Sequence, residues 1–232
     1  MPIAQYLNSS IGKKQIVAVT GLLLIGFVLG HLAGNLLIYG GPDLYNAYAK
    51  KLASLRPGLY LIEFGLLGIF VAHMYVTALL VIENIQARGQ ARYSVSRPVG
   101  ERSWATRLMP YTGTFLLAFI IWHLLDFTFV DHHGPGSIVR GKELALYGVV
   151  YNAFADPWHS LLYVLAMFCL GLHLSHGIQS CFQTFGCIPS SREAVIAKIS
   201  NGLGFLIAAA YSSLPIYVFF HNYFRMKQII CT

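Results

Sequence analysis

Five long apolar stretches, separated by shorter polar segments, dominate the pattern of this chain. They lie near residues 16–39, 59–82, 108–130, 160–182 and 203–224. Each is long enough to cross a bilayer as an α-helix, which takes about 20 apolar residues. The polar segments leave little room for a separate soluble domain. The pattern therefore predicts one all-α domain over residues 1–232, a polytopic membrane protein with five transmembrane helices in a bundle.

Composition supports the same class. Of the 232 residues 56% are hydrophobic and only 11% are charged, whereas soluble domains have about 25% charged residues. The apolar run that follows Lys13 and Lys14 is of full length and has no signal-peptide cleavage site. We therefore expect the first span to act as its own insertion signal.

The distribution of basic residues predicts the orientation. With the N-terminus in the cytoplasm, the inner segments carry a Lys/Arg excess that is concentrated between the second and third spans, as the positive-inside rule requires. We therefore expect the N-terminus inside and the C-terminus outside. The net charge of +7 calls for no nucleic-acid partner, because a basic inner face follows from orientation and can seat an acidic soluble subunit. The inner basic residues are Lys13, Lys14, Arg88, Arg92, Arg97, Arg102, Arg107, Arg192 and Lys198.

Each of the first four spans holds one histidine: His31, His73, His123 and His173. Because successive spans run in opposite directions, equal distances from the span starts give two depths. At about 1.5 Å per residue, His31 and His123 lie ~20 Å from the first face, and His73 and His173 ~21 Å from the other. In a core of about 30 Å, two pairs are then stacked about 10 Å apart. A polar ring at that depth is costly, and two stacked bis-histidine haems are the simplest chemistry that explains the four positions.

Other roles for these histidines stay open. A single membrane histidine is often an interhelical hydrogen-bond partner, although that alternative predicts scattered depths. His176 lies three residues after His173 on about the same helix face, so it is an alternative ligand or a contact for a haem propionate. Nearby glycines would let a flat macrocycle or a neighbouring backbone approach closely. These are Gly26, Gly30, Gly34, Gly65, Gly68, Gly171 and Gly177.

Two carboxylates fall near the outer histidine pair. Glu63 is about one turn inside the outer end of the second span, and Asp126 about one turn beyond His123. A carboxylate at such depth is a functional candidate, and quinol oxidation needs a proton acceptor near the electron acceptor. We take Glu63 as the candidate acceptor. The alternative, strongest for Asp126, is a partner for a nearby Arg, Tyr or amide. The other histidines are expected to be solvated or interfacial: His132, His133, His159 and His221.

Two stretches resemble a known family. Residues 9–21 read Ser-Ser-Ile-Gly-Lys-Lys-Gln-Ile-Val-Ala-Val-Thr-Gly and lead to His31-Leu-Ala-Gly-Asn-Leu36, and residues 171–186 read Gly-Leu-His-Leu-Ser-His-Gly-Ile-Gln-Ser-Cys-Phe-Gln-Thr-Phe-Gly. They resemble the membrane-anchor cytochrome b subunit of succinate dehydrogenase/fumarate reductase, in its single-chain, five-span, di-haem form. The likeness covers essentially the whole chain, because five spans with histidines in the first four are that family's plan.

The resemblance implies a function. His73 and His173 would hold a proximal haem b, and His31 and His123 a distal haem b near the quinone, for which we expect menaquinone. The basic loops would dock an iron–sulfur subunit, which connects to a flavoprotein subunit that carries the dicarboxylate chemistry. The chain would then be the quinone-reactive electron-transfer subunit in a bacterial cytoplasmic (inner) membrane, serving the tricarboxylic acid cycle or anaerobic respiration. Gly171 stands where some fumarate-reducing members carry a glutamate, which argues against a proton pathway through that position.

Two other classes remain as alternatives. A di-haem cytochrome b anchor of another quinone-linked dehydrogenase, such as a formate dehydrogenase or hydrogenase, would share the spectrum but not the two sequence stretches. A haem-free transporter would use the histidines as a proton relay. Against it, we expect neither a paired repeat nor a span broken in mid-membrane by Gly or Pro.

Overall fold

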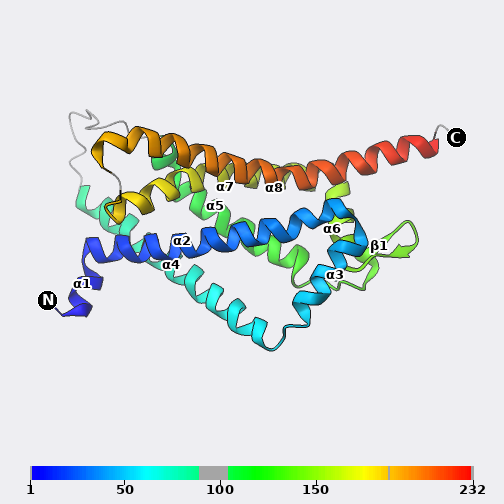
Figure 1. The fold of residues 1–232 in the computed structure, drawn as a ribbon, viewed down its shortest axis with the longest axis horizontal. Coiled ribbons are helices and arrows are strands. Elements are labelled where there is room, and N and C mark those ends of the chain that lie inside the picture. The colour runs from blue at the N-terminus through cyan, green and yellow to red at the C-terminus, as the bar shows by residue number, and fades with distance from the viewer. Residues whose placement is uncertain (1, 89–103, 188, 231–232) are drawn as a thin grey trace.

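The computed structural model describes residues 2–88, 104–187 and 189–230. Within them, five helices are long and apolar enough to cross a membrane, which confirms an all-α polytopic architecture. The chain passes up and down the bundle, so its two ends lie at opposite ends of the molecule (Figure 1). The five helices are α2 (Ser10–Asn35), α4 (Gly58–Arg88), α5 (Trp104–Phe127), α7 (Pro157–Thr184) and α8 (Glu193–Ile230).

Several helix ends differ from the limits of the apolar stretches. The helix α2 begins at Ser10 because the Ser9 hydroxyl accepts a hydrogen bond from the Gly12 amide at 3.1 Å, a typical N-cap. It continues into a 3-10 turn, η1 (Leu36–Gly40). The helix α8 begins at Glu193, well before residue 203, whereas α5 ends at Phe127, before residue 130. Hydropathy marks only the apolar part of a helix, and capping decides where the helix starts.

One end of the bundle carries a cap that the apolar pattern does not predict. We define the cap as η1, α3 (Pro42–Ala53), η2 (Pro135–Ser137), the hairpin β1 (Ile138–Val139) and β2 (Lys142–Glu143), and α6 (Ala145–Ala155). In the antiparallel hairpin Ile138 is opposite Glu143. We call this end the cap end. The opposite end, where α2 begins, is the N-terminal end and carries α1 (Ile3–Asn8) and η3 (Ser190–Arg192).

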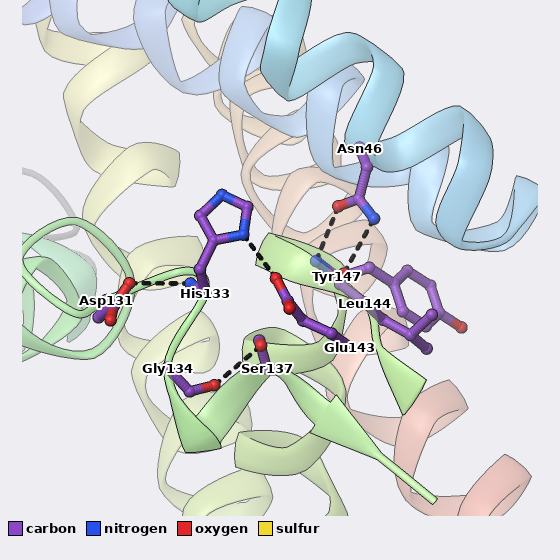
Figure 2. A network of polar contacts seen from close by, with 8 residues as sticks. All are labelled: Asn46, Asp131, His133, Gly134, Ser137, Glu143, Leu144 and Tyr147. Atoms are coloured by element: carbon purple, nitrogen blue, oxygen red, sulfur yellow. Dashed lines mark hydrogen bonds and ion pairs between the residues drawn. The ribbon is translucent and has the colours of Figure 1, made fainter. Parts of the chain in front are cut away.

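The side chain of Asn46 joins α3 to α6, the two helices of the cap, by two hydrogen bonds. The Asn46 amide on α3 donates to the Leu144 carbonyl at 2.9 Å and accepts from the Tyr147 amide at 3.0 Å, at the start of α6 (Figure 2). Beneath it lies an aromatic-rich core. Its buried members are Ile38, Tyr45, Tyr147, Val150, Tyr151, Phe154, Tyr163, Leu214 and Val218. The cap is therefore packed onto α7 and α8.

The helices of the bundle differ in how closely they pack. The helix α8 lies against α7 along most of its length (Figure 1). Their crossing depends on glycine, because a Cβ on Gly204 would come within 2.8 Å of both the Gly171 carbonyl oxygen and the Ser175 amide nitrogen. Gly171 thus serves helix packing. In contrast, α4 is the least covered span, and it diverges from α2 toward the cap end.

Candidate functional site

The first and third histidines meet near the cap end. His31 on α2 and His123 on α5 have ring centroids 5.8 Å apart, with ring planes at 86°. Phe27 stacks on His31 at 5.4 Å, and Phe119 stacks on His123 at 5.9 Å. The structure therefore brings together the two histidines that the depth argument pairs. We call them the cap-side pair.

The second and fourth histidines form a pair nearer the N-terminal end. His173 and His73 lie near enough for a charge on one imidazole to act on the other. The Nδ1 atom of His73, on α4, lies 3.0 Å from the hydroxyl of Thr20 on α2. The Nδ1 atom of His173, on α7, lies 3.2 Å from the hydroxyl of Thr112 on α5. We call His73 and His173 the N-side pair.

A glycine follows each of these threonines and lies under the same ring. A Cβ built on Gly21 would be 3.5 Å from His73 Cε1, and one built on Gly113 would be 3.5 Å from His173 Cε1. Both rings thus rest on a Thr-Gly dipeptide of the neighbouring helix, which we call a Thr-Gly seat. The Gly21 seat also adjoins the thiol of Cys181, at 3.8 Å from the same Cβ position.

The hydroxyl contacts favour one tautomer of the N-side pair. The Thr20 hydroxyl donates to the Ile16 carbonyl at 2.7 Å, and the Thr112 hydroxyl donates to the Leu108 carbonyl at 3.1 Å. A hydroxyl has one hydrogen to give, so its lone pair accepts the Nδ1–H of the histidine. The Nε2 atom of each imidazole then keeps a free lone pair, which is the form that binds a metal.

The two pairs are farther apart than the sequence suggests. Thr20 and Thr112, which mark the N-side pair, each precede a cap-side histidine on the same helix by eleven residues. At ~1.5 Å per residue the pairs are about 16 Å apart along these helices, rather than about 10 Å. The apolar edges of the spans are not level with one another, since Lys13 before the first span pairs with Glu83 just beyond the predicted end of the second.

Asparagine and tyrosine side chains, rather than Thr-Gly seats, contact the cap-side pair. Tyr163 donates to the Asp126 carboxylate at 2.7 Å, and its oxygen lies 3.5 Å from His123 Nδ1. Asn35 donates from Nδ2 to His31 Nε2 at 3.3 Å. The cap-side pair therefore has two different kinds of partner, one on each ring.

His159 is packed among other side chains, and its expected place at the membrane interface stays a prediction. Instead of being solvated, its side chain is only 18% exposed, and its buried Nε2 lies 3.2 Å from Asp126 Oδ2 without hydrogen-bond geometry. Its ring stacks on Tyr163 at 4.9 Å, beside Trp122 at 5.2 Å. The ring of His159 is therefore held among aromatic rings.

The candidate proton acceptor Glu63 lies on the surface of α4. It pairs with Arg56 at 3.2 Å, and both side chains are more than 40% exposed. The Arg56 guanidinium also lies 4.4 Å over the ring of Tyr60. Glu63 thus has the arginine partner that the sequence analysis gives as the alternative to a role in proton transfer. A role for Glu63 in proton transfer stays a prediction.

The remaining predicted positions are four histidines and the basic loop between the second and third spans. His176 interacts electrostatically with His173, and its role stays a prediction. His133 is exposed and pairs with Glu143 at 2.6 Å (Figure 2), whereas His221 contacts the Tyr151 hydroxyl at 3.1 Å. His132 lies 2.8 Å from the Phe127 carbonyl. The predicted docking loop, with Arg92, Arg97 and Arg102, lies outside the described residues.

The Thr-Gly seats are the part of the site that was missed. Their signal is present in the sequence, because Thr-Gly-x9-His occurs at 20–31 and again at 112–123. The repeat is only a few positions per span, too sparse to recognise before two histidines of other helices are seen to rest on it.

The donor set fits the group predicted for it. Metal–imidazole bonds are roughly 2 Å long, so two rings on opposite sides of one metal have centroids roughly 6 Å apart, close to the 5.8 Å of the cap-side pair. In the part of the chain that the structure describes, no three His, Cys, Asp or Glu side chains gather as a metal site. At four positions a Cβ would meet nothing within 4 Å, which leaves room beside α2 and α4: Gly26, Gly30, Gly65 and Gly68.

Comparison with protein-family models, curated proteins and solved structures finds no match for this chain. The functional argument therefore rests on the sequence and on the geometry of the two histidine pairs.

Proposed function

We propose that the chain is the membrane-anchor cytochrome b subunit of a succinate:quinone oxidoreductase or quinol:fumarate reductase. The observation that carries the proposal is the gathering of four histidines, one from each of four spans, into two pairs: one pair has ring centroids 5.8 Å apart, and the other has each Nδ1 atom beside a threonine hydroxyl. The motifs at residues 9–36 and 171–186 support the choice of family. Each pair would hold one haem b, His73 and His173 the proximal one and His31 and His123 the distal one.

The protein's own contribution is to hold the two haems and to orient their histidine ligands. When bound, two six-coordinate haems supply one-electron transfer and leave no open position for oxygen. The imidazoles act as neutral Nε2 ligands. On the N-side the threonine hydroxyls keep that tautomer. On the cap-side Asn35 has to release the Nε2 atom of His31, which it now contacts. Dicarboxylate chemistry would belong to a flavoprotein subunit, reached through an iron–sulfur subunit.

Quinol oxidation at the distal end would release two protons for every two electrons, and side chains must receive them. Glu63 is the acceptor that the sequence suggests. Asp126 is favoured by its contacts, because Tyr163 connects it to His123. Glu63→Gln and Asp126→Asn, assayed separately for menaquinol oxidation, distinguish the two. The residue that receives the proton is the one whose amide variant loses activity while both haems stay bound.

The orientation and location belong to the same proposal. The N-terminal end would face the cytoplasm of a bacterium and the cap the outside, with the bundle in the inner membrane. The proximal haem would then lie on the side of the soluble subunits and the distal haem on the side of the quinone.

A spectrum of the protein purified from its native membrane tests the proposal. We expect a dithionite-reduced minus oxidised spectrum of b-type haem, and a pyridine haemochrome assay that gives two haems per chain. Co-purifying flavin and iron–sulfur subunits would separate this function from an anchor of another quinone-linked dehydrogenase. A folded preparation without haem would overturn the proposal and leave a histidine proton relay to pursue.

A further inference from the structure

We propose that Thr20 and Thr112 are positioning residues that hold both ligands of the N-side haem through matching Thr-Gly seats. The inference rests on the proposed function, because it concerns how this chain presents His73 and His173 to a haem. It adds that the two ligands of one haem are set by the same short motif on α2 and α5, and that the ligands of the other haem are not.

The two seats share the two contacts that define them, although the ring of His73 also has the Val17 backbone as a partner. The Nδ1–hydroxyl distances are 3.0 and 3.2 Å, and both glycine Cβ positions lie 3.5 Å from the Cε1 atom of the ring. Thr20 and Thr112 are 8% and 6% exposed. Two contacts of the same type, on two helices that occupy equivalent places in the repeat, indicate one device used twice.

The simpler alternative is that these threonine hydroxyls only donate hydrogen bonds to backbone carbonyls of their own helix. Ser and Thr in membrane helices often bond the carbonyl four residues before them. Thr114 does just that, donating to the Pro110 carbonyl at 2.9 Å, and it is exposed on the same helix as Thr112. Thr20 and Thr112 make the same backbone bond and in addition accept from an imidazole. Thr114 is therefore the natural control.

The seat has consequences that can be measured on the haem. A hydrogen bond from Nδ1–H to an oxygen makes an imidazole a stronger donor and fixes its ring plane. Stronger donation favours the oxidised metal, so the seats lower the midpoint potential of the N-side haem. Removing a hydroxyl should raise that potential and alter the low-spin electron paramagnetic resonance (EPR) signal, and the cap-side haem should keep both of its own values.

Glycine makes the seat possible. A methyl group at Gly21 or Gly113 would reach ordinary van der Waals contact with the ring, so only a larger side chain would displace the histidine. Gly21→Leu and Gly113→Leu should therefore lose the N-side haem. Gly202→Leu places the same side chain on α8 where a Cβ meets nothing within 4 Å, away from the histidines, and it should keep both haems.

The test is a redox titration with EPR on the purified complex of five variants: Thr20→Val, Thr112→Val, Thr20→Ser, Thr112→Ser and Thr114→Val. We expect each of the first two to move one of the two haem waves to higher potential, or to remove one haem of the two. Both serine variants and Thr114→Val should match the unsubstituted protein. The same wave must move in both valine variants, because both threonines serve one haem.

Three results would overturn the inference: unchanged waves in both valine variants, equal shifts of both waves, or serine variants that behave like valine. Serine keeps the hydroxyl and valine keeps the volume, so a packing role would affect them in the opposite order. An unsubstituted protein that binds no haem would instead refute the proposed function itself, which keeps the two failures distinct.

Discussion

The two histidine pairs are built from the same residue type and supported in different ways. The N-side pair rests on two like seats, each a threonine and a glycine of a neighbouring helix. The cap-side pair has an asparagine on one ring and a tyrosine on the other, and that tyrosine is bonded to a carboxylate. The first arrangement suits a site that only passes electrons. The second brings groups that can exchange protons close to one ligand, as a quinone-facing site needs.

Replacing a ligand is the strongest way to break the comparison. His173→Ala should remove the N-side haem and His123→Ala the cap-side haem, because a six-coordinate haem needs both axial ligands. The pyridine haemochrome assay should then give one haem per chain instead of two, and the surviving redox wave should differ between the variants. His133→Ala, at an exposed histidine of the cap, should keep two haems. Retention of both haems in either ligand variant contradicts the assignment.

A smaller effect is expected from the crossing of α7 and α8, which lies beside the N-side pair. Gly204→Ala brings a methyl group within 2.8 Å of the backbone around Gly171, two residues before His173. Overpacking of this kind costs about 1–3 kcal/mol. We expect a lower thermal unfolding midpoint and a change in the N-side EPR signal before the cap-side one. Gly202→Ala is the matched control, since a Cβ there meets nothing within 4 Å; an equal loss of stability in both variants would exclude the crossing as the cause.

Tyr163→Phe sharpens the comparison from the other side. It removes the donor to Asp126 and the oxygen next to His123, so it should move only the cap-side wave. Leaving the half-buried Asp126 without this donor costs about 1–3 kcal/mol. Tyr75→Phe, at an exposed tyrosine of α4, should change neither wave. A shift of the N-side wave in Tyr163→Phe would show that the pairs are not independent.

The smallest predicted effect is an alkaline sensitivity of the cap. Burial, and then the neighbouring Tyr48, raise the pKa of Tyr45 to about 12, from about 10 in an unfolded chain. A raised pKa means that the protonated form stabilises the fold fully below pH 10, and that this stability is lost as pH rises through about 12. Tyr45 donates to the side-chain Oδ1 atom of Asn35 at 3.2 Å, and the side chain of Asn35 contacts His31.

Thermal unfolding measured from pH 9 to pH 12 checks this. Tyr45→Phe should unfold at a lower temperature at neutral pH and fall less steeply between pH 10 and pH 12. The cap-side spectrum should change in that range before the N-side spectrum does. Identical pH profiles for the two proteins would rule out Tyr45 as the titrating group.

The transmembrane part of the fold can be predicted because a membrane leaves few choices. Twenty apolar residues in a row have to be helical there, and polar rings inside them stand out by their cost. The pairing of His31 with His123 follows from counting residues along such helices. The cap cannot be found in this way, because α3 and α6 are too short to span a membrane. The apolar residues of α6 instead pack against α8 and α3.

The finer geometry of the site depends on how the spans are offset. Counting from the apolar edges places His73 too close to the cap-side pair, and only the contact with Thr20 shows its true level. Likewise, the contact of His159 with Tyr163, one turn along α7, is local, but nothing in the local sequence reveals the contact with Trp122, because that ring comes from α5. The exposed position of Glu63 depends on the divergence of α4 from the bundle.

The alternation of the four spans also bears on how the protein is made. Each pair takes one ring from the first helical hairpin, α2 with α4, and the other ring from the second, α5 with α7. As the chain emerges from the ribosome, the cap-side pair is complete once α5 has entered the membrane, whereas the N-side pair waits for α7. We therefore expect an order in biogenesis. The two histidines of the cap-side pair can meet on an unfinished chain, whereas those of the N-side pair meet only after α7 has been inserted.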